Sequence, residues 1–168
     1  ELIKKIVFKY LNIISNKNFN HFLQDFLNEI KNINEPILFD IISINIIDKC
    51  INDPKYQEQY IEICNQLWSD NSIIKNFITI HQNPEGFFWS LNNDAKLNGP
   101  YKSLQDLKSN VIKIYSFKQI LINHLRNEFQ NKDKYIQEYE QKIKTDVDAG
   151  FKMKRKIIGI FEIIVLLY

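Results

Sequence analysis

The sequence predicts an all-α protein, a solenoid of about three to four stacked antiparallel helix pairs. Three observations lead to this fold class. Apolar residues recur at helical spacing along most of the chain, helix pairs repeat roughly every forty residues, and no segment shows convincing strand alternation. Stacked pairs of this period bury their apolar faces against their neighbours. The 168 residues are enough for one such domain, spanning 1–168.

The first half of the chain is the most regular. Apolar side chains form one helical stripe over residues 2–14 and a second over 19–30. Residues 36–51 are apolar nearly all round, which predicts a helix buried between its neighbours. Asp53 and Pro54 suit the N-cap and the first position of the helix that follows.

The second half contains an irregular insertion at about 81–110. Helical spacing predicts helices around it, over about 73–81 and 111–129, from about 135 and from about 154. Within the insertion, Gly86, Gly99 and Pro100 mark turns. We expect a long connection there, or a short hairpin with Asn92-Asn93 at its turn.

Charge and cysteine content bear on compartment and partners. The net charge is +2, with 8 basic and 10 acidic residues in 1–84 but 14 basic and 10 acidic residues in 85–168. This asymmetry permits RNA contact through the second half, although an ordinary solvated surface is favoured. Cys50 and Cys64 lie in apolar helical patterns, so we expect buried free thiols in a reducing, cytoplasmic setting.

The apolar run at 157–168 is too short to predict membrane association. It has only twelve residues and contains Glu162. A membrane-spanning helix needs about twenty apolar residues. We therefore expect a buried helix that the end of the sequence cuts short.

No catalytic or metal-binding pattern is evident, so we expect no enzyme, no cofactor and no metal. His21, His81 and His124 share no helical face with further metal ligands. A glycine-rich phosphate loop and a nucleophile elbow are both missing from the sequence. Asp146 and Asp148 lack the remaining ligands of a calcium loop, and a solvated turn is favoured there.

Two further clusters are possible RNA contacts. The first is Trp89, in an aromatic run beside two lysines, where simple core packing is favoured over stacking on bases. The second is a basic cluster near the end of the sequence, for which a charged helix start is the simpler interpretation. Its members are Lys152, Lys154, Arg155 and Lys156.

Several motifs occur in an order that resembles a known family. LNIIS at 11–15 is followed by Phe19, and an apolar helix over 41–50 runs into NDPKYQEQYIEIC at 52–64. LINHLRNEFQ follows at 121–130, and then a basic run precedes IIGIFEIIVLLY. The chain resembles the middle domain of eukaryotic translation initiation factor 4G, a crescent of stacked HEAT-like helix pairs. Its many Ile, Asn and Lys residues are typical of an AT-rich genome.

The resemblance implies a scaffold for cap-dependent translation that binds a DEAD-box RNA helicase of the initiation factor 4A type. In that family the first inter-helix turn grips the helicase, which implies contact by Leu11, Ile14 and Phe19 here, with Lys17 at the rim. The alternative is that the three apolar residues belong to the core, as their helical phase permits. A cap-binding protein would bind regions outside this chain.

The sequence also departs from the family pattern. Ile160 replaces an asparagine, the 81–110 insertion has no counterpart, and the chain ends near the start of the fourth helix pair. We therefore expect a domain that is incomplete at its C-terminus relative to the family. Two other functions remain open: a scaffold of the same fold in splicing, nonsense-mediated decay or nuclear cap binding, and a direct RNA-binding module.

Overall fold

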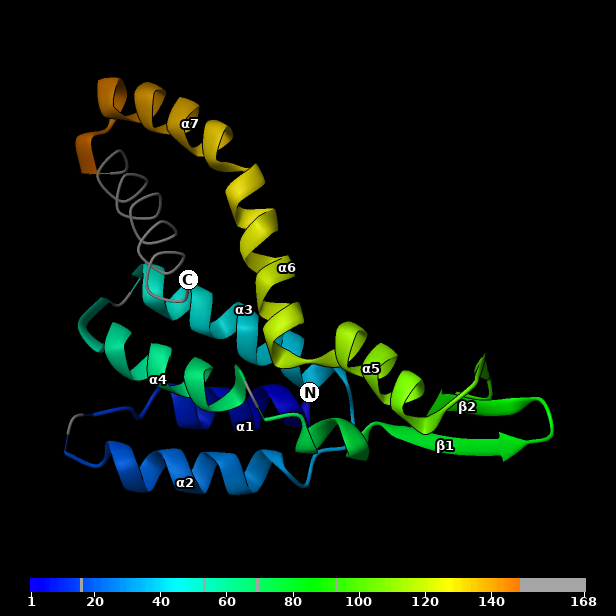
Figure 1. Ribbon diagram of the computed structural model, residues 1–168. Coiled ribbons are helices and arrows are strands. Elements are labelled where there is room, and N and C mark those ends of the chain that lie inside the picture. The colour runs from blue at the N-terminus through cyan, green and yellow to red at the C-terminus, as the bar shows by residue number, and fades with distance from the viewer. Residues whose placement is uncertain (16, 53, 69, 93, 149–168) are drawn as a thin grey trace.

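The computed structural model describes residues 1–148 except 16, 53, 69 and 93, and it shows a mostly helical protein with one small sheet (Figure 1). The α-helices are α1 (Leu2–Leu11), α2 (Phe19–Ile30), α3 (Ile37–Asn52), α4 (Gln57–Trp68), α5 (Leu104–Tyr115), α6 (Phe117–Gln130) and α7 (Lys132–Thr145). Two 3₁₀ helices, η1 (Pro54–Tyr56) and η2 (Ser72–Asn76), precede α4 and the sheet. The strands are β1 (Ile78–Asn83), β2 (Gly86–Leu91) and β3 (Asn98–Tyr101).

The first four helices form two packed pairs, as the apolar stripes predict. Tyr10 of α1 packs against Phe22 and Phe26 of α2, and α3 lies beside α4 (Figure 1). Helix α3 is also in contact with α1 and α6. The prediction of a central buried helix is confirmed, because the side chains of α3 are buried on several sides.

The prediction of one continuous helix over 111–129 is wrong in one respect, because the observed helix is interrupted at Ser116. This residue has extended backbone angles, with φ −63° and ψ 144°. Its backbone N–H bonds to the Ile112 carbonyl and so ends α5, while its hydroxyl accepts from the backbone N–H of Gln119 in the first turn of α6. One serine therefore ends one helix and caps the next.

The all-α prediction is confirmed only in part: the described residues are mostly helical, but residues 78–101 form a three-stranded antiparallel sheet, in the order β1-β2-β3. The helix predicted over 73–81 is instead the 3₁₀ helix η2 followed by β1. Ile73, Ile74 and Phe77 have helical spacing, which misled the sequence prediction, but Ile78 and Ile80 alternate as strand residues do. The connection between β2 and β3 contains Asn92, so a hairpin at this place is present.

Two glycines permit the close turns of the sheet. Gly86 has φ +139° and follows the turn at Pro84-Glu85, and Gly99 has φ +140° in β3. A Cβ atom on Gly86 would lie 2.6 Å from the Tyr101 carbonyl oxygen, and one on Gly99 would lie 2.7 Å from the Phe87 carbonyl oxygen. Both positions therefore require glycine.

An aromatic cluster joins the sheet to the helices. Phe39 of α3 makes edge-on contacts with Phe77, which directly precedes β1, and with Phe117 at the start of α6. All three rings are fully buried. Cys50 and Cys64 are also buried free thiols, which confirms the prediction for their side chains. Burial raises the pKa of Cys50 to about 12 and raises that of Cys64 further.

Helices α6 and α7 do not form an antiparallel pair. They are separated by Asn131 alone; α6 packs against α3 and α4, whereas α7 extends beyond these helices as an arm (Figure 1). The described residues thus contain two packed helix pairs, a sheet and this arm, rather than a plain solenoid of three to four pairs. Within the same residues, no helix is both long and apolar enough to cross a membrane.

Candidate partner-binding surfaces

The turn between α1 and α2 lies at one edge of the helix stack. The Ser15 hydroxyl donates to the Asn18 side-chain oxygen at 2.7 Å, which braces the connection locally. The Tyr60 hydroxyl of α4 donates to the Leu11 carbonyl at 3.5 Å. This contact ties the end of α1 to the second helix pair. In the motif Tyr56, Tyr60, Cys64, the second and third side chains are fully buried and therefore serve packing.

The structure separates the four predicted helicase contacts into two groups. Leu11 and Ile14 are 1% and 5% exposed and belong to the core. Phe19 is half-buried at the start of α2, where its ring stacks on Phe22 with centroids 6.1 Å apart. Lys17 is exposed. Of the four residues, only Phe19 and Lys17 therefore present side-chain surface to a partner.

Sequence reasoning missed an exposed apolar residue in the same turn. Ile13 is 53% exposed and lies between the two buried residues Leu11 and Ile14. Ile13 is out of phase with the helical stripe over residues 2–14, and this was the available signal. Together, Ile13, Lys17 and Phe19 make up what we call the first-turn surface.

The other predicted RNA contacts do not form a surface in the described residues. Trp89 is 4% exposed and packs edge-on against Tyr115 of α5, with ring centroids 5.8 Å apart. Its ring is therefore occupied by core packing, which was the favoured alternative. Lys152, Lys154, Arg155 and Lys156 lie outside the described residues, as do Asp53 and its predicted capping role.

The histidine side chains make polar contacts within or between the helices and strands of the fold. His124 of α6 lies 2.9 Å from the Asp40 carboxylate of α3, and His81 of β1 lies 3.0 Å from the Ser90 hydroxyl of β2. His21 and Asp25 are neighbours on the exposed face of α2. In the part of the chain that the structure describes, no group of three or more His, Cys, Asp or Glu could hold a metal ion.

A second surface is a groove between β1 and α5, which we call the β1–α5 groove. Its volume is about 550 Å³. It is lined mainly by aliphatic side chains from η2, β1 and α5, with two lysines among them: Ile74, Lys75, Ile78, Ile80, Lys108 and Ile112. The sequence signal for it was the alternation Ile78, Ile80 in β1, which the helical interpretation of this segment concealed.

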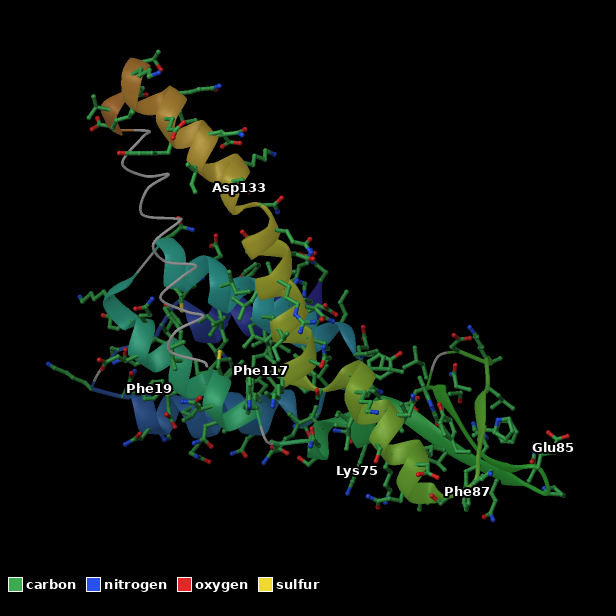
Figure 2. All side chains as sticks on the ribbon, turned by 45° about the horizontal axis from the view of Figure 1, so that its top comes forward. Phe19, Lys75, Glu85, Phe87, Phe117 and Asp133 are labelled. Atoms are coloured by element: carbon green, nitrogen blue, oxygen red, sulfur yellow. The ribbon has the colours of Figure 1, made fainter. Side chains whose placement is uncertain are left out.

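The two surfaces lie on different parts of the molecule. Figure 2 shows Phe19 at the end of the helical pairs and Lys75 near the base of the β1–β2 hairpin, with Phe117 between these regions and Glu85 at the hairpin tip. Comparisons with known proteins do not assign either surface. Neither a family model, nor a curated protein, nor a solved structure matches the chain.

Proposed function

We propose that this chain is a translation-initiation scaffold that binds a DEAD-box RNA helicase of the initiation factor 4A type in cap-dependent translation. The observation that carries the proposal is the first-turn surface. It places exposed apolar side chains at the turn where the initiation factor 4G middle domain, which the sequence resembles, grips its helicase. The two packed helix pairs behind this turn are consistent with such a platform.

Burial divides the roles among the residues of the turn. Leu11 and Ile14 are core residues, so they support the backbone of the turn from inside. Ile13 and Phe19 offer apolar surface to the helicase, and Lys17 lies beside them as an exposed charge. Apolar anchors at the centre of an interface contribute most of its binding energy, while rim charges contribute little to it.

The proposed mechanism is conformational rather than chemical. A helicase of this class has two lobes, and a scaffold can change their equilibrium only by binding one lobe arrangement more tightly than another. The first-turn surface would hold one lobe. Contacts to the other lobe would come from elsewhere in the scaffold.

The test is titration calorimetry against the 4A-type helicase of the same genome. We expect the Ile13→Asp variant to lower the affinity about tenfold or more, because it places a charge within an apolar contact. Phe19→Ser should have a similar effect. Ile44→Asp is the matched control, since Ile44 is also 53% exposed but lies on α3, away from the turn.

The outcomes separate the possible readings of the surface. Loss of binding in folded Ile13→Asp protein, with Ile44→Asp unaffected, supports the proposal. Equal helicase affinity of the wild type, Ile13→Asp and Ile44→Asp, or no binding by the wild type, contradicts it. Circular dichroism melts show whether Phe19→Ser, whose ring stacks on Phe22, remains folded.

Two alternatives differ in partner and in salt dependence. A scaffold of the same fold in splicing, nonsense-mediated decay or nuclear cap binding would select a different helicase in the same titration. Direct RNA binding would weaken steeply as salt rises, because it releases counterions from phosphates. An apolar helicase contact should be far less sensitive to salt.

A further inference from the structure

Strand β1 is a sheet edge without the usual protection. The strand order makes β1 and β3 the two edges. β3 has only four residues, includes Pro100, and pairs with β2 through a register irregularity. β1 has six residues, Ile-Thr-Ile-His-Gln-Asn, without proline or any Lys, Arg, Asp or Glu. Short length, proline and charge are the features that normally stop an edge from pairing with another chain.

The outward backbone groups of β1 belong to three residues. The Phe77 carbonyl accepts from the Asn92 N–H at 3.1 Å, so Phe77 is bonded toward β2. Bonded and non-bonded positions alternate along an antiparallel ladder. The N–H and C=O groups of Ile78, Ile80 and Gln82 therefore point away from β2.

The β1–α5 groove runs beside this edge. Ile78 and Ile80 pair with Leu91 and Trp89, on the face of the sheet that packs against α5. Helix α5 is in contact with β2 and β3, which leaves the β1 part of this face open. Ile80 is consequently 43% exposed, and Ile112 across the groove is 37% exposed.

The groove is also lined by positive charge. Lys75 and Lys108 line it, and the described residues that line it include no carboxylate. Neither lysine has an ion-pair partner among the described residues. A segment that fits here therefore combines aliphatic side chains with acidic ones.

We propose that β1 accepts an extended segment of a partner protein as a fourth strand, with aliphatic side chains in the β1–α5 groove and an Asp or Glu side chain against Lys75 or Lys108. Backbone hydrogen bonds to Ile78, Ile80 and Gln82 supply affinity, and the groove selects every second side chain. This site is independent of the first-turn surface, and it would give a scaffold a second partner.

The first experiment uses a random decapeptide library displayed on phage, selected against the folded chain. We expect enriched peptides in which aliphatic residues alternate and an acidic residue flanks them. Enrichment of basic peptides, of peptides without alternation, or of none would overturn the proposal. The most enriched peptide is then made with a fluorescent label for anisotropy titration.

The backbone contact is tested with Gln82→Pro beside Gln82→Ala. Proline removes an outward N–H but leaves the bonds between β1 and β2 intact. We expect about a tenfold loss of peptide affinity for Gln82→Pro and little change for Gln82→Ala. A peptide with alternate backbone nitrogens methylated should also fail to bind. Full binding by Gln82→Pro that is shown to be folded, or by the methylated peptide, would rule out strand addition.

The charge contact is tested with Lys75→Glu and Lys108→Glu. Lys113→Glu is the matched control, because it is exposed on α5 but does not line the groove. We expect the double variant Lys75→Glu/Lys108→Glu to lose peptide binding and the Lys113→Glu control to retain it. Analytical ultracentrifugation of the chain without peptide shows whether it is a monomer or a dimer. A dimer that the Gln82→Pro variant no longer forms would mean that a second copy of the chain, and not a partner protein, pairs with β1, contrary to the proposal.

Discussion

At the scale of single residues, one partly buried hydrogen bond joins the two helices of the first pair. Tyr10 of α1 is buried, and its hydroxyl donates to the Glu29 carboxylate of α2 at 2.5 Å. This hydrogen bond to Glu29 is the main cause that raises the pKa of Tyr10 to about 12, with burial as the second cause. The same ring contacts Phe22 and Phe26, so one side chain joins both the polar and the apolar parts of the interface.

The Tyr10→Phe variant tests this contact. We expect a loss of about 1.5 kcal/mol in the free energy of unfolding at pH 8, because a hydrogen bond to a charged acceptor is removed. Urea denaturation gives this value. Tyr139→Phe on α7 is the control, since that hydroxyl has no hydrogen bond among the described residues.

The same contact predicts a pH dependence. The folded pKa of Tyr10 lies above its unfolded value of 10, so its contribution is complete below pH 10 and is lost as pH rises toward 12. The difference in stability between wild type and Tyr10→Phe should therefore narrow over that interval. A difference that stays constant from pH 9 to pH 12 would contradict the assigned hydrogen bond.

At the scale of elements, capping and turn residues decide where helices and strands stop. The Ser103 hydroxyl accepts from the Asp106 N–H at 3.1 Å and starts α5, and Ser116 separates α5 from α6. In the sheet, Asn83-Pro84-Glu85-Gly86 forms the β1–β2 turn, with the Asn83 side chain accepting from the Glu85 N–H at 2.9 Å. Proline fixes its own φ in this turn, and the following Gly86 takes a positive φ.

The Gly99→Ala variant tests the connection between β2 and β3. We expect a loss of about 1–3 kcal/mol in the free energy of unfolding, because the new Cβ meets the Phe87 carbonyl oxygen at a backbone angle that favours glycine. Thermal melts followed by circular dichroism provide the measurement. Glu85→Ala, exposed at the hairpin tip, should stay within about 0.5 kcal/mol of the wild type.

At the scale of the whole molecule, the aromatic cluster makes the sheet and the helices one folded unit. Phe77 lies between η2 and β1, and its ring packs 5.5 Å from that of Phe39 in the central helix α3. The Phe39 ring centroid in turn lies 5.7 Å from that of Phe117, where α6 begins. The sheet is thus anchored in the core, to which its own Trp89 also belongs, rather than attached at the surface.

The Phe77→Ala variant tests whether the two parts unfold together. We expect a loss of about 3–5 kcal/mol, because a fully buried ring is removed, and a single transition that remains shared by helices and sheet. Far-UV circular dichroism and the fluorescence of buried Trp89, measured in a Trp68→Phe background so that only the sheet tryptophan emits, should give the same midpoint. Phe8→Ala, at a 43% exposed site, is the control. Separate midpoints for the two signals would contradict a common core.

The sequence by itself determined the helices whose apolar faces are local and periodic. The stripes of α1 and α2 and the all-round apolar character of α3 are visible in the order of residues, because a helix brings every third and fourth side chain to one face. Burial of Cys50 and Cys64 follows from the same pattern. The strand signal was also present, as the alternation of Ile78 and Ile80 before an Asn-Pro-Glu-Gly turn, but it overlapped with a helical spacing at Ile73, Ile74 and Phe77.

Only the tertiary structure decided which apolar residues remain exposed. Leu11, Ile13 and Ile14 are chemically alike and lie within four residues, yet packing buries the first and third and leaves Ile13 at the surface. The β1–α5 groove exists because α5 covers β2 and β3 but leaves the face of β1 open, and no local pattern records where one element lies on another. Exposure depends on contacts between residues far apart in the chain, which is why surfaces for partners had to come from the fold.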